Sequence, residues 1–200
     1  MQSRNLQRNL FVLAVILGIL ASVLVAVLSG QQVNAEGMNT EAMEYDETIN
    51  MWITGANQGD FNGGSMRAGR EGTIDVLGFS HSVVMPIDAA TGYPTGKRVH
   101  SPLTIVKEID QATPLLFQAL VTNENLVDVT IRWYRIDPAS GGEEQYYTIE
   151  LQNAAVASIM EYSGGDHALM ETVSFTYQKI IWTWVDGGIT STDDWESPTV

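Results

Sequence analysis

After residue 125, apolar and polar positions repeat with the two-residue period of a β-strand. The apolar positions of the first such run are Val127, Val129, Ile131 and Trp133, and polar or charged residues stand between them. This alternation predicts a strand with one buried and one solvated face. The same period predicts strands over residues 143–151, 154–162, 171–185 and 189–195, separated by turn-forming residues at 137–142 and 186–188.

The segments before residue 126 are less regular. Residues 49–54 and 72–85 are rich in β-branched side chains and predict two strands. Gly78, in the middle of the second run, indicates a bulge or a sharp bend. Residues 99–109 predict another strand. Because proline cannot donate to a central ladder, Pro102 places that strand at a sheet edge or a bulge.

One soluble helix is expected, beginning at Thr113 and Pro114 and ending at about Val121. Threonine suits the N-cap and proline suits the first helical position. Its apolar residues fall at helical spacing, which favours packing on the sheet over docking of a partner; they are Leu115, Leu116, Ala119 and Leu120. About eight strands and one short helix predict a mainly β domain, a barrel or a sandwich.

The tryptophans support the same interpretation. Trp133 is expected in the core. Trp182 and Trp184 fall two residues apart on one strand face, which favours the core or the closure of a barrel. Stacking of these two rings against a partner subunit is the alternative.

Between the strands at 72–85 and 99–109 lies a turn-rich arm, Pro86 to Arg98, that is longer than a hairpin needs. A long ordered arm on a small β domain is typical of a contact between subunits, whereas a disordered excursion is the alternative. Lys97 and Arg98 are basic residues in a strongly acidic chain and are expected to meet a neighbour's carboxylates. The residues predicted to form this subunit interface are Pro86, Ile87, Asp88, Thr91, Gly92, Tyr93, Pro94, Thr95, Gly96, Lys97 and Arg98.

Residues 1–35 predict an N-terminal hydrophobic helix that serves as a signal peptide or a membrane anchor. Arg4 and Arg8 precede an almost unbroken apolar run over residues 10–28, which exceeds a typical signal core of about 7–15 residues and nearly suffices to span a bilayer. Small residues before position 36 predict cleavage between Ala35 and Glu36; an uncleaved run would retain the protein in the membrane. Residues 36–48 predict an acidic flexible arm, and residues 49–200 the β domain.

Charge and composition exclude several classes of partner. All 24 acidic residues but only eight of the ten basic ones follow Ala35, so that part carries 8 − 24 = −16 formal charges. Such a surface repels phosphate and disfavours nucleic acid. It favours solubility, or adaptation to salty surroundings where screening weakens the repulsion. The chain has no cysteine, which excludes disulfides and cysteine-based metal sites or nucleophiles.

No set of residues predicts catalysis, a cofactor or a metal. His81, His100 and His167 lack the spacing of convergent ligands. Residues 78–82 resemble a nucleophile elbow but lie inside a strand pattern and lack the last glycine. The acidic residues at 186 and 193–196 lack the spacing of a calcium loop and are expected to be a solvated turn and tail.

Several short motifs, in order and spacing, resemble the Hcp (haemolysin-coregulated protein) family of the type VI secretion system over residues 50–195. They are Arg70-Glu71-Gly72, Pro86-Ile87-Asp88, Thr91-Gly92, Thr95-Gly96, His100-Ser101-Pro102, Lys107-Glu108-Ile109-Asp110, Thr113-Pro114, Trp133-Tyr134 and Trp182-Thr183-Trp184. The resemblance implies a β-barrel of two sheets with one short α-helix and a long extended loop. It also implies hexameric rings that stack into a hollow tube, with the loop contacting adjacent subunits. Sheath, spike and effector proteins are the further partners it implies, and no enzymatic activity is expected.

The hydrophobic N-terminus departs from that family, whose members resemble cytoplasmic proteins ejected by their own apparatus. Three explanations are open: a misplaced start codon with Met38 or Met43 as the true start, export followed by tube formation outside the cell, or a tether through the N-terminus. The expected location is extracellular after export, with a membrane-anchored form, or a cytoplasmic form before ejection, as alternatives. The competing function is a monomeric secreted or membrane-anchored β-sheet binding module.

Overall fold

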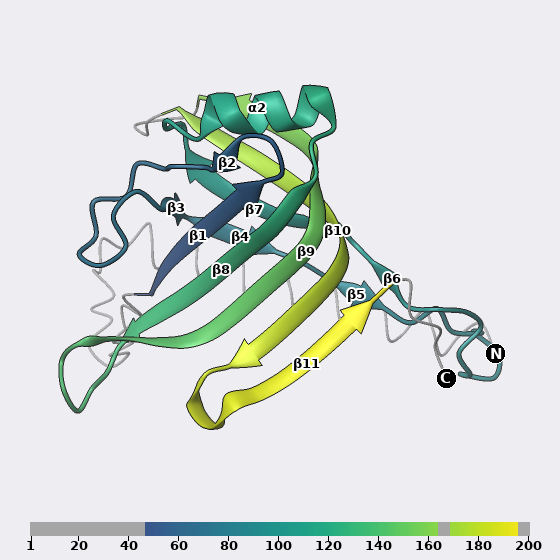
Figure 1. Ribbon diagram of the computed structural model, residues 1–200. Helices are drawn as coiled ribbons and strands as arrows, with labels where there is room; N and C mark the ends of the chain where they lie inside the picture. Colours follow the sequence, from purple (N-terminus) through teal and green to yellow (C-terminus); the bar gives the residue numbers. More distant parts are fainter. Residues whose placement is uncertain (1–46, 164–168, 196–200) are drawn as a thin grey trace, which may run out of the picture. The chain divides into compact units, whose positions relative to one another are not determined.

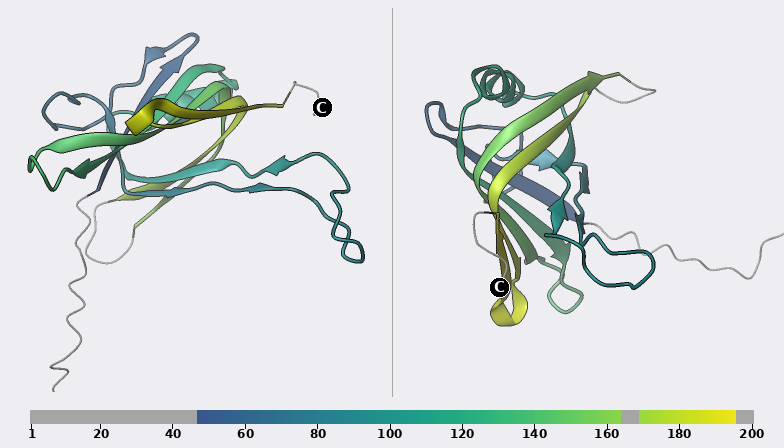
Figure 2. Two further views of the ribbon diagram at one scale, coloured as in Figure 1. Left: turned by 90° about the horizontal axis from the view of Figure 1, so that it is seen from below. Right: turned by 90° about the vertical axis from the view of Figure 1, so that its right-hand side faces the viewer.

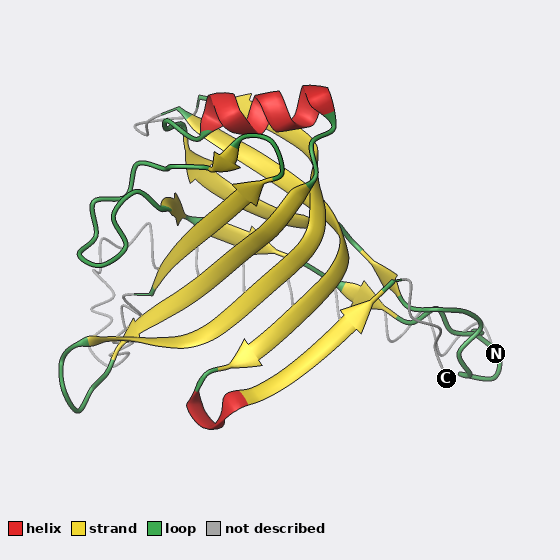
Figure 3. Ribbon diagram, viewed as in Figure 1, coloured by secondary structure: helices red, strands yellow, loops and turns green. Residues whose placement is uncertain are grey.

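In the computed structural model, the described residues are 47–163 and 169–195. They form a mainly β structure with one α-helix, α2 (Thr113–Thr122), and a short 3-10 turn, η1 (Asp186–Gly188) (Figures 1 and 3). The strands are β1 (Thr48–Gly55), β2 (Gly59–Asp60), β3 (Ile74–Val76), β4 (Gly78–Ser80), β5 (Val83–Val84), β6 (Val99–His100), β7 (Leu103–Glu108), β8 (Leu126–Ile136), β9 (Glu143–Tyr162), β10 (Met170–Trp184) and β11 (Ile189–Asp194).

Antiparallel pairing closes the main sheet into a barrel. The order β1-β8-β9-β10-β7-β4 runs around most of the circumference. β3 and β4 are separated only by Leu77 and pair on opposite sides, β3 with β1 and β4 with β7. This one extended segment therefore joins the two ends of the sheet and removes edges that would otherwise be exposed. The predicted mainly β barrel with one short helix is confirmed.

The second sheet is the two-stranded ribbon β5–β6, which leads out of the barrel into the arm (Figure 1). Val83 pairs with His100 and Val84 with Val99. The single strand predicted over residues 72–85 was wrong: that segment is three short strands, because its pairing changes from β1 to β7 at Leu77 and then leaves the main sheet. Gly78 lies at the first of these changes, where a bend was expected.

The core is lined by inward-facing apolar side chains from both sides of the barrel. Val129, Ile131 and Trp133 are buried as predicted, but Val127 is exposed and Leu126 is buried in its place. The reason is a shift of register between β1 and β8 at Thr54 and Gly55, which interrupts the alternation at that end of β8.

The helix α2 lies across the upper end of the barrel in Figure 1. Leu116 and Ala119 are buried and Leu115 and Leu120 pack against the core, so the predicted packing on the sheet is confirmed. The N-cap is Ala112 rather than Thr113. The hydroxyl of Thr113 donates to a buried carboxylate instead, 2.8 Å away on β10.

The strands predicted over 143–151 and 154–162 are one continuous strand, β9. Asn153 lies between them with a φ of 50°, and its side chain donates to the Oε1 of Gln178 on β10 at 2.8 Å. A single residue in the left-handed region bends the strand without ending it. The expected turns at 137–142 and 186–188 are both present.

Several predictions fall outside the described residues. They are the leader at 1–35, cleavage between Ala35 and Glu36, nearly all of the acidic arm at 36–48, and His167. Within the described ranges, no helix is both long enough and apolar enough to cross a membrane.

Candidate assembly arm and the network at its root

The arm predicted at residues 86–98 is an ordered hairpin that continues the β5–β6 ribbon and projects far beyond the barrel (Figure 2, left). Ile87 forms an isolated bridge with Pro94. The amide of Asp88 donates to the carbonyl oxygen of Tyr93 at 2.9 Å, and the amide of Thr95 donates to that of Pro86 at 2.9 Å. These bonds contradict the alternative of a disordered excursion.

The tip of the arm is held by an Asp-centred turn. One carboxylate oxygen of Asp88 accepts from the amide and the hydroxyl of Thr91, both at 2.8 Å. These hydrogen bonds, the hydroxyl first, lower the pKa of Asp88. Gly92 follows with a φ of 73°, which favours glycine. The turn chemistry in the sequence therefore shapes the tip without help from a partner.

The arm exposes several large apolar side chains to solvent. Tyr93 is 74% exposed and Ile87 is 63% exposed. The ribbon that carries them adds further exposed apolar residues: Val83, Val84, Met85 and Val99. Several exposed apolar side chains on one protrusion are typical of a protein–protein contact.

At the root of the arm, four side chains that are far apart in the sequence form one hydrogen-bonded chain. The ring Nε2 of His81 lies 2.6 Å from the hydroxyl of Tyr177, and that hydroxyl lies 2.7 Å from Nδ1 of His100. Nε2 of His100 lies 2.6 Å from a carboxylate oxygen of Asp193. We call these four residues the root network. It joins both sides of the arm's base to β10 and β11.

Arg98 anchors the root network at its acidic end. Its Nε donates to Asp193 at 2.5 Å, its Nη2 makes a second contact with the same carboxylate, and Nη2 also donates to the carbonyl oxygen of Asp194 at 2.8 Å. This arrangement lowers the pKa of Asp193, chiefly through the hydrogen bond from Arg98. Arg98 is thus engaged within its own protomer, whereas we expected it to meet a neighbour. Asp193 is not part of a solvated tail.

The number of protons on the four side chains determines which atom donates and which accepts in each hydrogen bond of the root network. Asp193 is ionised and accepts the Nε2–H of His100, so in a neutral His100 ring Nδ1 accepts the single hydroxyl proton of Tyr177. The oxygen of Tyr177 then accepts Nε2–H from His81. Burial and the charge of Asp193 raise the pKa of Tyr177, which keeps its hydroxyl protonated. Each of the three contacts in the root network therefore has one donor and one acceptor.

The network accommodates one added proton but not two. If His100 is protonated, its Nδ1 donates to Tyr177 and the hydroxyl turns toward a neutral His81. If both rings are protonated, two donors face one oxygen, the hydroxyl proton loses its acceptor, and two cations lie with ring centroids 5.8 Å apart. Burial, and secondly the charge of His100, lower the pKa of His81 accordingly.

Aromatic rings shield the root network from water. The ring of His100 stacks on Trp182 at 6.3 Å and lies 5.1 Å from Trp195, between ring centroids. Trp182 therefore packs against both the core and the root of the arm, and Trp133 is in the core as predicted. Trp184 is partly exposed and packs edge-on against Tyr146.

The sequence alone does not bring His81, His100 and Asp193 together, because 19 and 93 positions separate His100 from the other two and no local pattern marks them. Among the residues that the structure describes, no group of three or more His, Cys, Asp or Glu side chains has the geometry to hold a metal ion. Gly78 to Ser80 is strand β4, and the hydroxyl of Ser82 lies 3.1 Å from that of Ser101 rather than near a base.

Comparison with known proteins identifies the family. The model of the family described as type VI secretion system effector, Hcp, matches residues 50–184. The "Major exported protein" of Pseudomonas aeruginosa PAO1 is 42% identical over 164 residues, covering 74% of this chain and 95% of that protein.

Solved structures of Hcp proteins are also similar to this chain. The Hcp1 protein of the E. coli EAEC 042 pathovar matches with a TM-score of 0.69 and 34% identity, covering 74% of this chain and 98% of that one. The secreted protein Hcp3 of Pseudomonas aeruginosa matches with a TM-score of 0.65 and 37% identity, covering 76% and 99%. The chain therefore belongs to the Hcp family of type VI secretion tube proteins, which are structural proteins and not enzymes.

Proposed function

We propose that this chain is a structural subunit whose copies form hexameric rings, and that the rings stack into a hollow tube. The observation that carries this proposal is the arm: an ordered hairpin, anchored at its root, that holds exposed apolar side chains away from a closed barrel. The two ends of the main sheet are used for closure, so the arm, with its exposed apolar side chains, is the feature best suited to engage another copy. The relatives' tube-forming family supports the same conclusion.

The function is mechanical. A ring arises when one surface of a subunit docks on a different surface of the next and the rotation closes. Two settings fit the chain: the inner tube of a type VI apparatus, with sheath and spike partners and effectors carried inside, or an extracellular tubular filament. The name of the relative, an exported protein, supports secretion. Contact with a membrane would run only through residues 10–28, if they are uncleaved.

Electron microscopy of the purified full-length protein tests the proposal. Rings or tubes are the expected result. Strictly monomeric protein at high concentration, across salt and pH, would refute it and favour the secreted or anchored binding module.

A deletion tests whether the arm makes the contact that stacks the rings. Removing Tyr93–Lys97 should abolish stacking while circular dichroism still reports a folded β domain, because these residues contribute nothing to the core. The matched control removes five residues, Pro138–Gly142, from the other exposed hairpin loop, and should still stack. Unchanged tubes after the arm deletion would count against the arm as the contact.

The N-terminus is tested separately. Sequencing of the exported protein should begin at Glu36. Recovery of intact Met1 would favour an anchor, and a start at Met38 would favour a misplaced start codon.

A further inference from the structure

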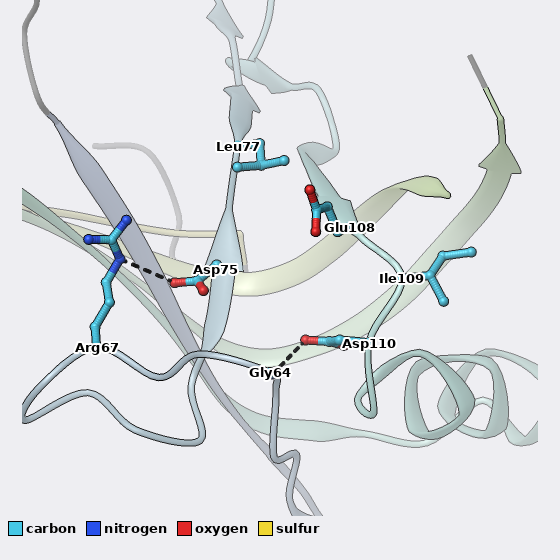
Figure 4. Close-up of a pocket in the computed structure, with 7 residues that line it drawn as sticks. All are labelled: Gly64, Arg67, Asp75, Leu77, Glu108, Ile109 and Asp110. Atoms are coloured by element: carbon cyan, nitrogen blue, oxygen red, sulfur yellow. Dashed lines mark hydrogen bonds and ion pairs between the residues drawn. The ribbon is translucent and has the colours of Figure 1, made fainter. Parts of the chain in front are cut away.

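The arm has a counterpart at the far end of the strands that carry it. β4 pairs with β7, with Gly78 opposite Val106 and Ser80 opposite Thr104. One end of this ribbon continues into the arm. The other end opens on a pocket of about 370 Å³, lined by Gly64, Arg67, Asp75, Leu77, Glu108, Ile109 and Asp110 (Figure 4). Arm and pocket therefore lie at opposite ends of the same two strands.

Most charges in the pocket are satisfied within the protomer. Arg67 pairs with Asp75 at 3.6 Å, and Asp75 also accepts from Asn50 at 2.8 Å. Asp110 accepts from Lys107 and from the amide of Gly64, both at 2.8 Å. These contacts leave the pocket's remaining carboxylate to be accounted for.

That carboxylate is Glu108. Its side chain is exposed and makes no hydrogen bond or ion pair with any described residue, while its backbone pairs with Met170 and accepts from Lys107. Leu77 shares the pocket and is 60% exposed. In Figure 4 both side chains project into the same space above Asp75. Among the described residues, the pocket thus contains one carboxylate without an ion-pair partner beside one exposed apolar side chain.

The arm presents the complementary pair. Asp88 is held by Thr91 and Arg98 is held by Asp193. Lys97 is exposed and makes no ion pair with any residue of the described ranges. Tyr93, four residues before it, is the most exposed aromatic of the arm. Among the described residues, the arm therefore has one ammonium without an ion-pair partner near one exposed aromatic ring.

We propose that the arm of one copy docks in this pocket of the next copy, with the ammonium of Lys97 on the carboxylate of Glu108 and the ring of Tyr93 over Leu77. This inference rests on the proposed tube and specifies the contact that builds it. Because arm and pocket lie at opposite ends of one ribbon, the contact is head-to-tail, and every copy offers one of each to its neighbours. The ion pair fixes register, and burial of the two apolar side chains adds affinity.

Charge reversal tests the ion pair. Lys97→Glu alone and Glu108→Lys alone should each raise the lowest concentration at which tubes form by at least about tenfold, because each places like charges together. The double variant should return to within about threefold of the wild type. Asp186→Lys, the same type of change at the exposed turn between β10 and β11, should stay within about threefold. A double variant no better than the worse single variant would overturn the pairing.

Crosslinking tests the contact directly, because the chain has no cysteine of its own. A full-length variant with Tyr93→Cys and Leu77→Cys should give a ladder of disulfide-linked species in air, since each copy then carries both halves of one contact. A disulfide requires Cβ atoms about 3.5–4.5 Å apart. Either single variant should give no ladder.

The outcomes separate the two proposals. Tubes that assemble without a ladder would overturn the docking site and leave the tube standing. Wild-type protein that never assembles would refute the tube and this contact with it. A ladder together with rescue by the double charge reversal supports both.

Discussion

A buried ion pair lies where α2 packs on the barrel, and breaking this pair should lower the free energy of unfolding by a measurable amount. Lys107 on β7 and Glu171 on β10 are both 0% exposed, and their charged atoms lie 2.7 Å apart. Lys107 also donates to Asp110 at 2.8 Å, and Glu171 accepts from Thr113 at the start of α2 at 2.8 Å. Two strands and the helix therefore meet at one pair of opposite charges.

Replacing Lys107 with methionine keeps most of the apolar stem and removes the ammonium. Glu171 is then a buried carboxylate with only Thr113 as a donor, and its second oxygen already has no partner among the described residues. Breaking a buried pair in this way costs about 3–5 kcal/mol. Replacing Glu171 with methionine as well removes the stranded charge, and the double variant should recover at least half of that loss, since apolar substitutes for a buried pair are often nearly neutral.

Urea unfolding followed by tryptophan fluorescence measures the effect. With an m-value of about 2 kcal/mol per molar urea, the midpoint of Lys107→Met should fall by about 2 M. Lys179→Met, at a partly buried lysine on β10, is the control and should change the unfolding free energy by less than about 0.5 kcal/mol. All variants are compared at one protein concentration, because self-association shifts the midpoint. A Lys107→Met midpoint within about 0.5 M of the wild type, or a double variant as unstable as the single one, would refute the reasoning.

Two further predictions use the same assay. Burial and a neighbouring charge lower the pKa of His81, so the folded protein binds a proton at His81 less readily than the unfolded chain does. The histidine pKa of the unfolded chain is about 6.5. The folded protein therefore keeps its full stability above about pH 6.5 and loses stability as the pH drops below that value. His81→Gln should flatten that decline between pH 7 and 5, and an equally steep decline would contradict the assignment. Gly63→Ala would place a Cβ 2.4 Å from a backbone carbonyl oxygen and should cost about 1–3 kcal/mol. Gly96→Ala, with nothing within 4 Å of the new Cβ, should be nearly neutral, and equal effects of the two changes would count against the packing argument.

The fold could be predicted where the relevant information is local. The period of two located β8, β9 and β10, and Pro114 with the apolar stripe located α2. Local pattern failed where pairing decides the outcome. Residues 72–85 have uniform β propensity, yet they contribute to three different pairings, and Val127 is exposed because the register slips beside it. A pattern along one strand carries no information on which partner it has or where the register changes.

The same limit applies to the candidate site. The arm was predicted because proline and glycine act on their own backbone. The root network was missed because its residues come from the base of the arm, from β10 and from the end of β11, and directly bonded partners are up to 96 positions apart. An aspartate in an acidic tail and two separate histidines are ordinary surface residues until the chain is folded. Only closure of the barrel places them in contact.

The pairing of β10 explains why the arm leaves the barrel at this point. The first half of β10, Met170 to Phe175, pairs with β7, and the last part, Lys179 to Trp184, pairs with β11. The sheet therefore splits on that side of β10, and Tyr177 lies in the gap between the two partners. Where the backbone ladder is interrupted, side chains supply the hydrogen bonds.

The root network fills this gap, with His81 and His100 entering from the base of the arm and Asp193 from β11. The same split that releases β5 and β6 from the main sheet thus creates the site that fixes their direction. Because the fully buried core consists of apolar side chains, almost all from the strands and α2, and none of these side chains belongs to the root network, loss of the network should reorient the arm before it unfolds the barrel. The root network therefore sets the orientation of the arm, while its contribution to the stability of the domain is small beside that of the core, and assembly can be disrupted at the root while the fold persists.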